Sequence, residues 1–429
     1  MARPEQSFRS LSGMHDLFEP ETTRRRALVT VFAERAERAG YGEVRPPVLE
    51  ELGVFLRMGE ATDVVSKEMY EFEDKDGRRV ALRPELTAGV VRAFVQHHPP
   101  TPWKVWYAGT SFRRERPAAG RYRAFDQIGA EVLGVDDPDL DVEVISLAWS
   151  TIAALGLSDV RLIINSLGDQ VDRQRYSESV AAYLADHRDE LSEAARATAE
   201  RNPLRVLDTK RPEDRAVVAS APSIAEFRSE ASAAHFERVL AGLSSLGIPF
   251  GVEERLVRGL DYYRRTTFEI VADSLDAAQN AVGGGGRYDG LAEDLGGPPT
   301  DGIGFALGID RLLLACDAEE VFPAPPTSVD VYVVDTTDGA AARDLVHQLR
   351  EAGLAADRRY GGGSLKSQMK SADRSGARWA VLIGSDELSA GEVTLRNLRA
   401  DGEQLRVASS DVTAALLERL HTDREDTTA

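Results

Sequence analysis

The stretch FRRERPAAGRYRAFDQIGAEVLG (residues 112–134) sets a loop crowded with arginine against a following run of strand-forming residues. The segment before it, WKVWYAGTSF (residues 103–112), is also rich in β-formers, so the two runs predict antiparallel strands joined by the basic loop. Guanidinium groups gathered in this way suit polyphosphate oxygens, which their planar forks bind in pairs. A solvated, charged hairpin is the alternative that this segment alone leaves open.

The second strand of this pair predicts a small-molecule pocket. Side chains alternate between the two faces of a strand, so Gln127, Gly129 and Glu131 point to the same side. A glycine between two polar side chains leaves room for a small ligand there.

The rest of the chain predicts an α+β fold with two domains. Apolar residues recur at helical spacing in residues 21–39, and β-rich segments continue to GIGFALGIDRLLLA (residues 302–315). Ala, Glu and Arg at helical periods in residues 166–247 predict a helical insertion. Beyond a proline-rich linker, strands alternate with helices as in a compact α/β domain. The predicted boundaries are 1–320 for the first domain, 321–328 for the linker, 329–421 for the second domain and 422–429 for a disordered tail.

The composition excludes several classes of protein. With 429 residues, 42% of them hydrophobic, the chain can bury a substantial core. It has no apolar run of the roughly 18 residues that a membrane span needs, and no signal peptide, so we expect a cytoplasmic protein without a membrane partner. Cys316 is the only cysteine, which excludes an internal disulfide and thiolate-rich zinc sites.

The charge balance constrains the partners less strictly. A net charge of −19 argues against a wholly basic surface for nucleic acid but allows a local basic patch. Only six lysines accompany 46 arginines, which fits either adaptation to high salt or a GC-rich genome.

Three further motifs carry polar groups. LRPELTAGVVRAF (residues 82–94) offers Glu85 and Thr87, which can receive an ammonium group or else cap a helix. GIDRLLLA places Arg311 at a helix start, where it could hold a nucleotide, although the glycines before it could equally serve close packing. VGGGGRYDGL (residues 282–291) is not a P-loop, because no Gly-Lys-Ser/Thr ending follows it.

Taken together, these blocks resemble class II aminoacyl-tRNA synthetases, and specifically the histidyl-tRNA synthetase family, over nearly the whole chain. The generic class II features are RPP (residues 45–47), FRRE (residues 112–115) and GIDRLLLA (residues 308–315). Two blocks are much more specific to the histidine enzymes. They are LVRGLDYYRRTTFE (residues 256–269), which holds more hydrogen-bonding groups than a strand needs, and GGRYDGL (residues 285–291).

The resemblance implies a fold and a reaction. The fold is a class II antiparallel sheet flanked by helices, with a helical insertion contacting tRNA and a C-terminal α/β anticodon-binding domain, in a homodimer. In the reaction, ATP activates L-histidine to histidyl adenylate, and the histidyl group passes to the 3′ terminal ribose of tRNA(His). Mg²⁺ accompanies ATP, and no metal ligand of protein origin is assigned.

Two alternatives share this core. One is the synthetase-like, histidine-sensing regulatory subunit of ATP phosphoribosyltransferase, whose members usually lack the C-terminal domain and the catalytic arginines that this chain keeps. The other is a synthetase for threonine, proline or glycine, which the paired tyrosines of RGLDYY disfavour.

The resemblance also implies roles for matching residues. Arg113 and Arg258 match the catalytic arginines at the α-phosphate, while Arg311 covers the adenine opposite Phe125 and holds the γ-phosphate. Glu131 and Tyr263 address the imidazole ring. The residues implied to bind ATP are Arg113, Glu115, Arg121, Phe125 and Arg311. Those implied to bind histidine are Glu85, Thr87 and Gln127 at the ammonium group, with Glu131, Arg258, Tyr262, Tyr263 and Tyr288 around the remainder.

The chain departs from the family pattern at three places. Leu86 stands where many bacterial members have glycine, and Asp126 replaces a common histidine. The loop tip, residues 117–120, lacks the polar residues often found there, so the resemblance does not establish how the acceptor end of tRNA is read. In the second domain, the positive charges implied to contact tRNA are Arg358, Arg359, Lys366 and Lys370, with Arg374 nearby.

Overall fold

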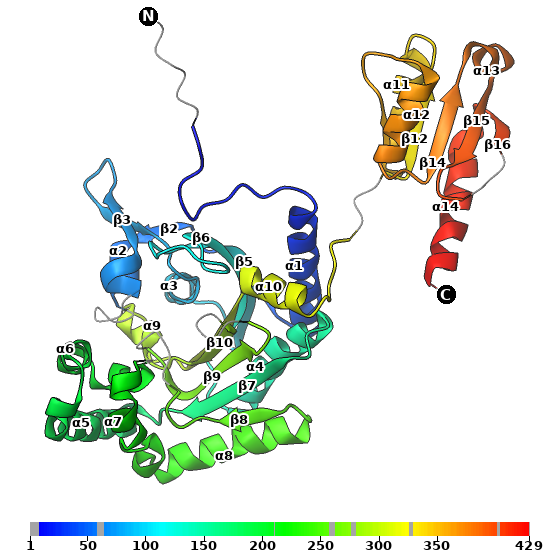
Figure 1. The fold of residues 1–429 in the computed structure, drawn as a ribbon. Coiled ribbons are helices and arrows are strands. Elements are labelled where there is room, and N and C mark those ends of the chain that lie inside the picture. Colours follow the sequence, from blue (N-terminus) through cyan, green and yellow to red (C-terminus); the bar gives the residue numbers. More distant parts are fainter. Residues whose placement is uncertain are drawn as a thin grey trace, which may run out of the picture. The chain divides into compact units, whose positions relative to one another are not determined.

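The computed structural model of the chain describes residues 8–57, 64–209, 211–256, 262–275, 280–325, 329–400 and 404–428. It divides into two compact units, Met1–Ala324 and Pro325–Ala429, and the division falls inside the segment expected to be a linker (Figure 1). None of the helices in these described ranges is long and apolar enough to cross a membrane.

The first unit is built on an eight-stranded sheet. Its strands run in the order β1 (Gly42–Glu43), β5 (Trp103–Phe112), β6 (Ala124–Leu133), β11 (Gly302–Gly308), β10 (Ala281–Arg287), β9 (Arg264–Ala272), β7 (Val160–Ser166) and β8 (Phe250–Val252). The inner six strands pair antiparallel, and only the short edge strands β1 and β8 pair parallel. The predicted antiparallel pair on either side of the arginine loop is β5 and β6, and it is confirmed.

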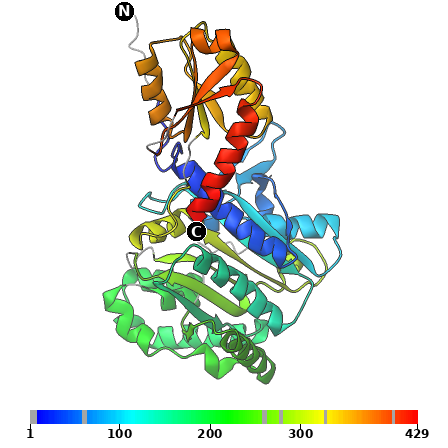
Figure 2. The same cartoon turned by 90° about the vertical axis from the view of Figure 1, so that its right-hand side faces the viewer.

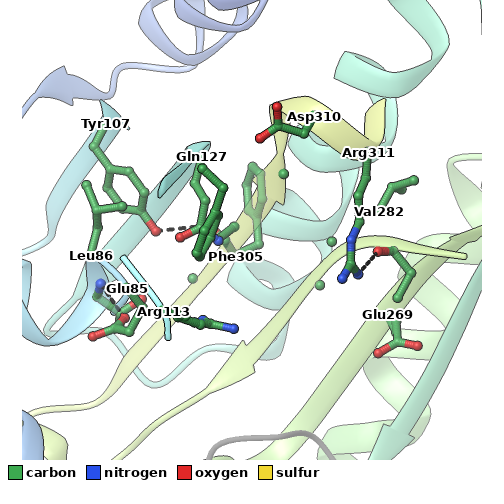
Figure 3. Close-up of a pocket in the computed structure, with 18 of the residues that line it drawn as sticks. Glu85, Leu86, Tyr107, Arg113, Gln127, Glu269, Val282, Phe305, Asp310 and Arg311 are labelled. Atoms are coloured by element: carbon green, nitrogen blue, oxygen red, sulfur yellow. Dashed lines mark hydrogen bonds between the residues drawn. The ribbon is translucent and has the colours of Figure 1, made fainter. Parts of the chain in front are cut away.

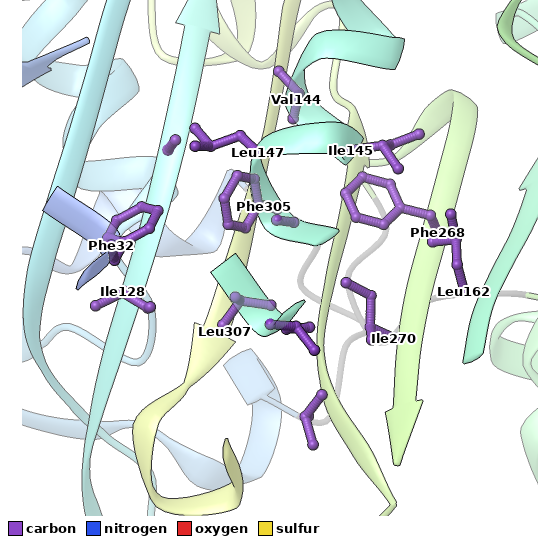
Figure 4. Packing of buried hydrophobic residues seen from close by; sticks show 14 of the residues in the cluster. Phe32, Ile128, Val144, Ile145, Leu147, Leu162, Phe268, Ile270, Phe305 and Leu307 are labelled. Atoms are coloured by element: carbon purple, nitrogen blue, oxygen red, sulfur yellow. The ribbon is translucent and has the colours of Figure 1, made fainter. Parts of the chain in front are cut away.

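One face of this sheet buries the main hydrophobic core. The helices that supply it are α1 (Glu21–Arg38), α4 (Pro138–Ala154), α8 (Glu230–Ser245) and α10 (Ile309–Ala318). Figure 4 shows Phe32 of α1 and Ile145 of α4 packed with Ile128, Phe305 and Phe268 from three strands, all of them almost wholly buried. The local sequence also determines where α4 begins. Asp137 caps the helix by accepting from the Asp139 amide at 2.9 Å, and Pro138 follows in the first turn.

A second hydrophobic cluster covers the part of the sheet that carries the polar motifs. It includes α3 and the paired tyrosines Tyr262 and Tyr263. Its secondary structure comprises α2 (Leu52–Leu56), α3 (Thr87–His97), α9 (Leu291–Asp294) and a small sheet of β2 (Leu49–Glu51), β4 (Arg79–Leu82) and β3 (Tyr70–Glu73). The polar side chains of these motifs therefore come from rigid, packed elements.

The helical insertion has a core of its own. It runs from the end of β7 to β8; α5 (Gln170–Asp186), α6 (Glu193–Arg201) and α7 (Arg215–Ala219) contribute to this core, whereas α8 packs on the main core. Tyr176, Val180 and Ile224 are among its buried residues. The expected antiparallel core with a helical insertion is thus confirmed (Figure 2).

The second unit is a five-stranded sheet with helices against it. Its strands run in the order β13 (Ala356–Arg358), β12 (Val331–Asp335), β14 (Trp379–Ile383), β15 (Glu392–Asn397) and β16 (Gln404–Ala408), and its helices are α11 (Ala340–Glu351), α12 (Leu365–Arg374), α13 (Ser385–Ala390) and α14 (Val412–Thr428). The first three strands are parallel, as the alternating pattern predicts, whereas β15 and β16 add an antiparallel hairpin. Helix α14 continues to Thr428, so most of residues 422–429, which the sequence predicts to be a disordered tail, have a helical backbone.

Candidate active site

A cleft in the first unit gathers residues from many separate parts of the chain. Every described residue predicted to bind ATP or histidine lines it: Glu85, Thr87, Arg113, Glu115, Arg121, Phe125, Gln127, Glu131, Tyr262, Tyr263, Tyr288 and Arg311. Arg258 lies outside the described residues. Figure 3 shows Glu85, Tyr107 and Gln127 at one end of the cleft and Arg311 with Glu269 at the other.

Glu131 is the centre of the first end. It is fully buried, and three hydroxyl groups donate to its carboxylate. Thr87 Oγ1 and Tyr107 Oη reach Oε1 at 2.7 and 3.1 Å, and Tyr288 Oη reaches Oε2 at 2.7 Å. The carboxylate is therefore held in one orientation before any ligand arrives.

Backbone packing leaves no room for a side chain between this carboxylate and β11. Glu131 on β6 pairs with Gly304 on β11, and a Cβ added to Gly304 would lie 1.6 Å from Glu131 Oε2. Gly129, two residues before Glu131, is equally constrained, because its Cβ would lie 2.5 Å from Tyr107 Oη. Only glycine fits at these positions while the side chains keep this arrangement.

The electrostatics of this end follow from its burial. Loss of water raises the pKa of Glu131 to about 8, although the hydroxyl donors oppose the rise. Nearby Glu85 adds negative charge and so reinforces it. Burial also raises the pKa of Glu85, despite the hydrogen bonds that it accepts. Two acids are thus held close together at the closed end of the cleft.

Glu85 itself caps a helix in this structure. Its two carboxylate oxygens accept from the backbone amides of Thr87 at 2.6 Å and Ala88 at 2.9 Å, at the start of α3. The capping alternative raised by the sequence is therefore observed, and the predicted ammonium contacts of Glu85 and Thr87 stay predictions. Gln127 uses Oε1 to accept from Ser111 Oγ at 3.0 Å.

Three tyrosines form an aromatic wall beside these acids. The rings of Tyr262 and Tyr263 lie 4.7 Å apart, and Tyr288 meets Tyr262 edge to face at 5.9 Å. All three side chains are buried. A flat, polar-edged ligand could lie against this wall while its ring nitrogens face hydroxyl and carboxylate groups.

The other end of the cleft is basic. Arg113 donates through Nε to Pro84 O at 2.9 Å, and its guanidinium lies 5.2 Å from the centre of the Phe125 ring. Arg311, at the start of α10, donates to Ala281 O at 2.7 Å and to Gly120 O at 3.2 Å. Burial lowers the pKa of the Arg311 guanidinium. The two arginines come from distant parts of the sequence and converge on one space.

Carboxylates accompany these cations. Glu115 accepts from Arg121 Nε, and this ion pair lies at the exposed rim of the cleft. Burial and the adjacent Glu115 raise the pKa of Glu68 to about 7. The pKa of Glu115 is lowered, because Arg121 outweighs the effect of burial. Glu269 on β9 also lines the cleft.

Three residues of this region were not predicted from the sequence. Tyr107 and Glu269 line the cleft, and Arg25 of α1, which does not line it, donates to the lining residue Asp310. Tyr107 pairs with Gly129 across β5 and β6, so strand alternation could have identified it. No local pattern marks Glu269 or Arg25, because their significance depends on contacts with distant segments.

Arg287 of the GGRYDGL block does not enter the cleft. It is fully buried and donates through Nε to Asp141 at 2.8 Å, and it also donates to Asp137 O at 2.8 Å. This ion pair ties the end of β10 to the start of α4. The neighbouring Tyr288 is thereby fixed in position, which links the second specific motif to the Glu131 site.

The second unit carries the predicted basic residues on β13 and α12. The guanidinium of Arg358 lies 4.8 Å from the ring centre of Tyr360, which is an exposed aromatic side chain, and Arg359 donates to Ser367. Lys366 and Lys370 are both exposed and lie one turn apart on α12. Their contact with tRNA stays a prediction.

Comparisons with known proteins agree over both units. A family model described as histidyl-tRNA synthetase matches residues 13–312, and one described as anticodon binding domain matches residues 329–419. Histidine–tRNA ligases of Rhodococcus erythropolis and Saccharopolyspora erythraea are 48% and 47% identical, covering 95% and 96% of this chain and 96% and 99% of theirs. The solved apo histidyl-tRNA synthetase of S. aureus superposes with a TM-score of 0.82 at 34% identity, over 96% of this chain and 100% of that one.

Proposed function

The chain belongs to the histidyl-tRNA synthetase family and is a histidine–tRNA ligase, and from this premise we propose how its cleft divides the work of the reaction. The buried end around Glu131 holds the imidazole of histidine. The basic end holds ATP. The observation that carries this proposal is the hydroxyl-bound Glu131 carboxylate in the same cleft as Arg113 and Arg311.

Selection of histidine follows from the hydrogen-bonding groups. A neutral imidazole presents one N–H donor and one acceptor nitrogen. Glu131 accepts from the ring N–H, and the Tyr263 hydroxyl donates to the other nitrogen. An apolar amino acid of similar size would leave these buried groups unpaired, which costs discrimination factors of about 10⁴ in comparable polar sites.

In the activation step, a carboxylate oxygen of histidine attacks the α-phosphorus of ATP. The new bond forms as the bond from that phosphorus to the oxygen bridging the β-phosphate breaks, and pyrophosphate leaves. Negative charge grows on the nonbridging oxygens, so cations already in place lower the barrier. Arg113 and Arg258 supply that charge in our proposal, while Arg311 and Phe125 hold the adenine and Glu115 meets its amino group.

In the transfer step, the 3′ terminal ribose of tRNA(His) attacks the histidyl carbonyl, and AMP leaves. The basic residues Arg358, Arg359, Lys366 and Lys370 contact the phosphates of the tRNA, which local positive charge supports. In the described part of the chain, no group of three or more His, Cys, Asp or Glu side chains is arranged to hold a metal ion. We propose that Mg²⁺ enters bound to ATP, and the cleft carboxylate Glu269 is its candidate neighbour.

The protein acts as a cytoplasmic homodimer in this proposal, as its membership of a translation family suggests. Sedimentation at micromolar concentration measures the assembly directly. The histidine-sensing regulatory alternative is not favoured, because the C-terminal domain matches an anticodon-binding family.

Exchange of labelled pyrophosphate into ATP tests the proposal. We expect exchange to require histidine and total tRNA to be charged with histidine alone when each amino acid is offered in turn. Exchange that responds equally to threonine or proline would reject the assignment of the pocket.

A further inference from the structure

Arg25 of α1 joins two elements of the nucleotide end without lining the cleft. Its side chain is only 11% exposed. One Nη binds Asp126 Oδ2 on β6 at 3.4 Å, and the other donates to Asp310 Oδ1 at the start of α10. The same guanidinium also donates to Glu21 of its own helix, at 2.8 and 3.1 Å. A single planar group therefore bridges three elements.

The two acids that Arg25 binds flank the walls of the adenine site. Asp126 follows Phe125, and Asp310 precedes Arg311. Figure 3 shows Asp310 and Arg311 at the start of α10 with side chains that extend in different directions. Asp126 lies on the face of β6 opposite Phe125, and Asp310 lines the cleft beside Arg311, so the guanidinium links the backbones of the two walls.

The contacts of these acids make the link rigid. Asp310 is 7% exposed, and its Oδ2 has no hydrogen-bond partner within the described residues. Burial raises the pKa of Asp310, and the charge of Arg25 opposes that rise. Asp126 is anchored on its other side by Thr110 Oγ1, which donates to Oδ1 at 2.6 Å. Movement of Arg25 would therefore remove the link between the two walls.

We propose that Arg25 is a positioning residue for ATP, which fixes the separation between Phe125 and Arg311 and so sets the width of the adenine site. The inference rests on the ATP site proposed above. Asp126, which departs from the common histidine of the family, supplies the negative partner on β6. The effect of Arg25 acts through its neighbours, since it does not line the cleft itself.

Arg25→Lys tests this role, because a lysine keeps the positive charge but cannot bridge two carboxylates as a planar fork does. Arg24→Lys is the matched control. Arg24 is the preceding residue on α1 and binds Phe322 O at 2.8 Å and Asp317, so it tethers the same helix without touching Asp126 or Asp310. Asp126→Asn removes the β6 arm alone and provides a second test if Arg25→Lys does not fold.

In pyrophosphate exchange, we expect Arg25→Lys to raise the KM for ATP about fivefold to tenfold, with kcat and the KM for histidine changed less than about twofold. Asp126→Asn should shift the ATP KM in the same direction. The double variant should be less than additive, because both changes break one contact. Arg24→Lys should match the wild type in both KM values and match Arg25→Lys in melting temperature.

An unchanged KM for ATP in both Arg25→Lys and Asp126→Asn would overturn the inference. Equal rises of both KM values in Arg25→Lys and Arg24→Lys would also overturn it, since they indicate only a general role of α1. Wild-type exchange that does not depend on histidine would instead reject the proposed function, so the two failures are distinguishable.

Discussion

The two ends of the cleft are built differently. At the histidine end, Glu131 is fully buried and already holds three hydroxyl donors. At the nucleotide end, Arg121 is 44% exposed and paired with Glu115 on the rim, and Arg113 donates to a backbone carbonyl and stacks on Phe125. The carboxylate at one end already has its hydrogen-bond partners, whereas the cations at the other end are partly exposed or held by few contacts.

This difference matches the chemical tasks that we assign to the two ends. The pocket discriminates between amino acids because a wrong one leaves its buried polar groups without partners. This penalty is large only if those groups are fixed in place and shielded from water. To bind triphosphate, the arginines must leave their present partners and bind phosphate oxygens instead. Exposed ion pairs are weak, so this exchange costs little free energy. The histidine end should therefore be sensitive to shape, and the nucleotide end to ionic conditions.

Gly304→Ala should produce the largest effect. Its Cβ would lie 1.6 Å from Glu131 Oε2, so the carboxylate must move and the hydroxyl network must break. We expect kcat/KM for histidine in pyrophosphate exchange to fall by about 10³ or more.

Gly308→Ala is the control for this change. Gly308 is on the same strand and the same face, four residues later, but its Cβ would meet only Val282 O, at 3.8 Å. We expect kcat/KM for histidine within about threefold of the wild type. Similar losses in both variants would show that the effect of Gly304→Ala does not depend on the Glu131 carboxylate, and would remove the contrast between the two ends.

Glu131→Gln should give the next largest loss, about 10² in kcat/KM for histidine, mainly through KM. The Glu131 carboxyl accepts from the ring N–H most strongly when it is ionised. Because burial raises the pKa of Glu131 to about 8, the ionised fraction grows as the pH rises toward that value. Wild-type kcat/KM for histidine should therefore rise with a midpoint near pH 8 and level off above it.

The same variant distinguishes the titration of Glu131 from the titration of the substrate in the pH profile. The imidazole of free histidine titrates near a pKa of about 6.5. The pH profile of Glu131→Gln should therefore keep this substrate step and lose the step near pH 8. Coincident pH profiles for the wild type and the variant, or an unchanged KM, would take Glu131 out of the ring contact.

Tyr107→Phe should have a smaller effect at the same end. It removes one of three donors, and Thr87 still reaches the same oxygen, Oε1. We expect the KM for histidine to rise about tenfold at pH 7, since a hydrogen bond to a charged group is typically worth about 1.5–3 kcal/mol. The step in kcat/KM should also move to higher pH, because one group that stabilises the ionised carboxylate is lost. A KM change without any movement of that step would indicate a packing role only.

The extent to which the sequence predicts these features differs from residue to residue. Gln127, Gly129 and Glu131 could be placed on one face of a strand because alternation is a local rule. Arg25 could not be assigned a function, because its partners Asp126 and Asp310 lie 101 and 285 residues away. On an amphipathic helix such an arginine is indistinguishable from a solvated one. The hairpin of β15 and β16 was likewise missed, since alternating strands and helices predict parallel pairing.

The smallest expected effect tests the nucleotide end alone. Salt screens exposed charges over roughly 10 Å at 0.1 M ionic strength and roughly 3 Å at 1 M, whereas buried groups are screened much less. Raising the salt concentration within this range should increase the KM for ATP about threefold and leave the KM for histidine within about twofold. Arg121→Met should reduce the salt dependence of the ATP KM, because it removes a rim cation that salt can screen. Steady-state pyrophosphate exchange at constant free Mg²⁺ measures both values. If salt raises the histidine KM as strongly as the ATP KM, the buried end responds to ionic strength like the exposed one, and the contrast between a preformed pocket and an exchangeable one does not hold.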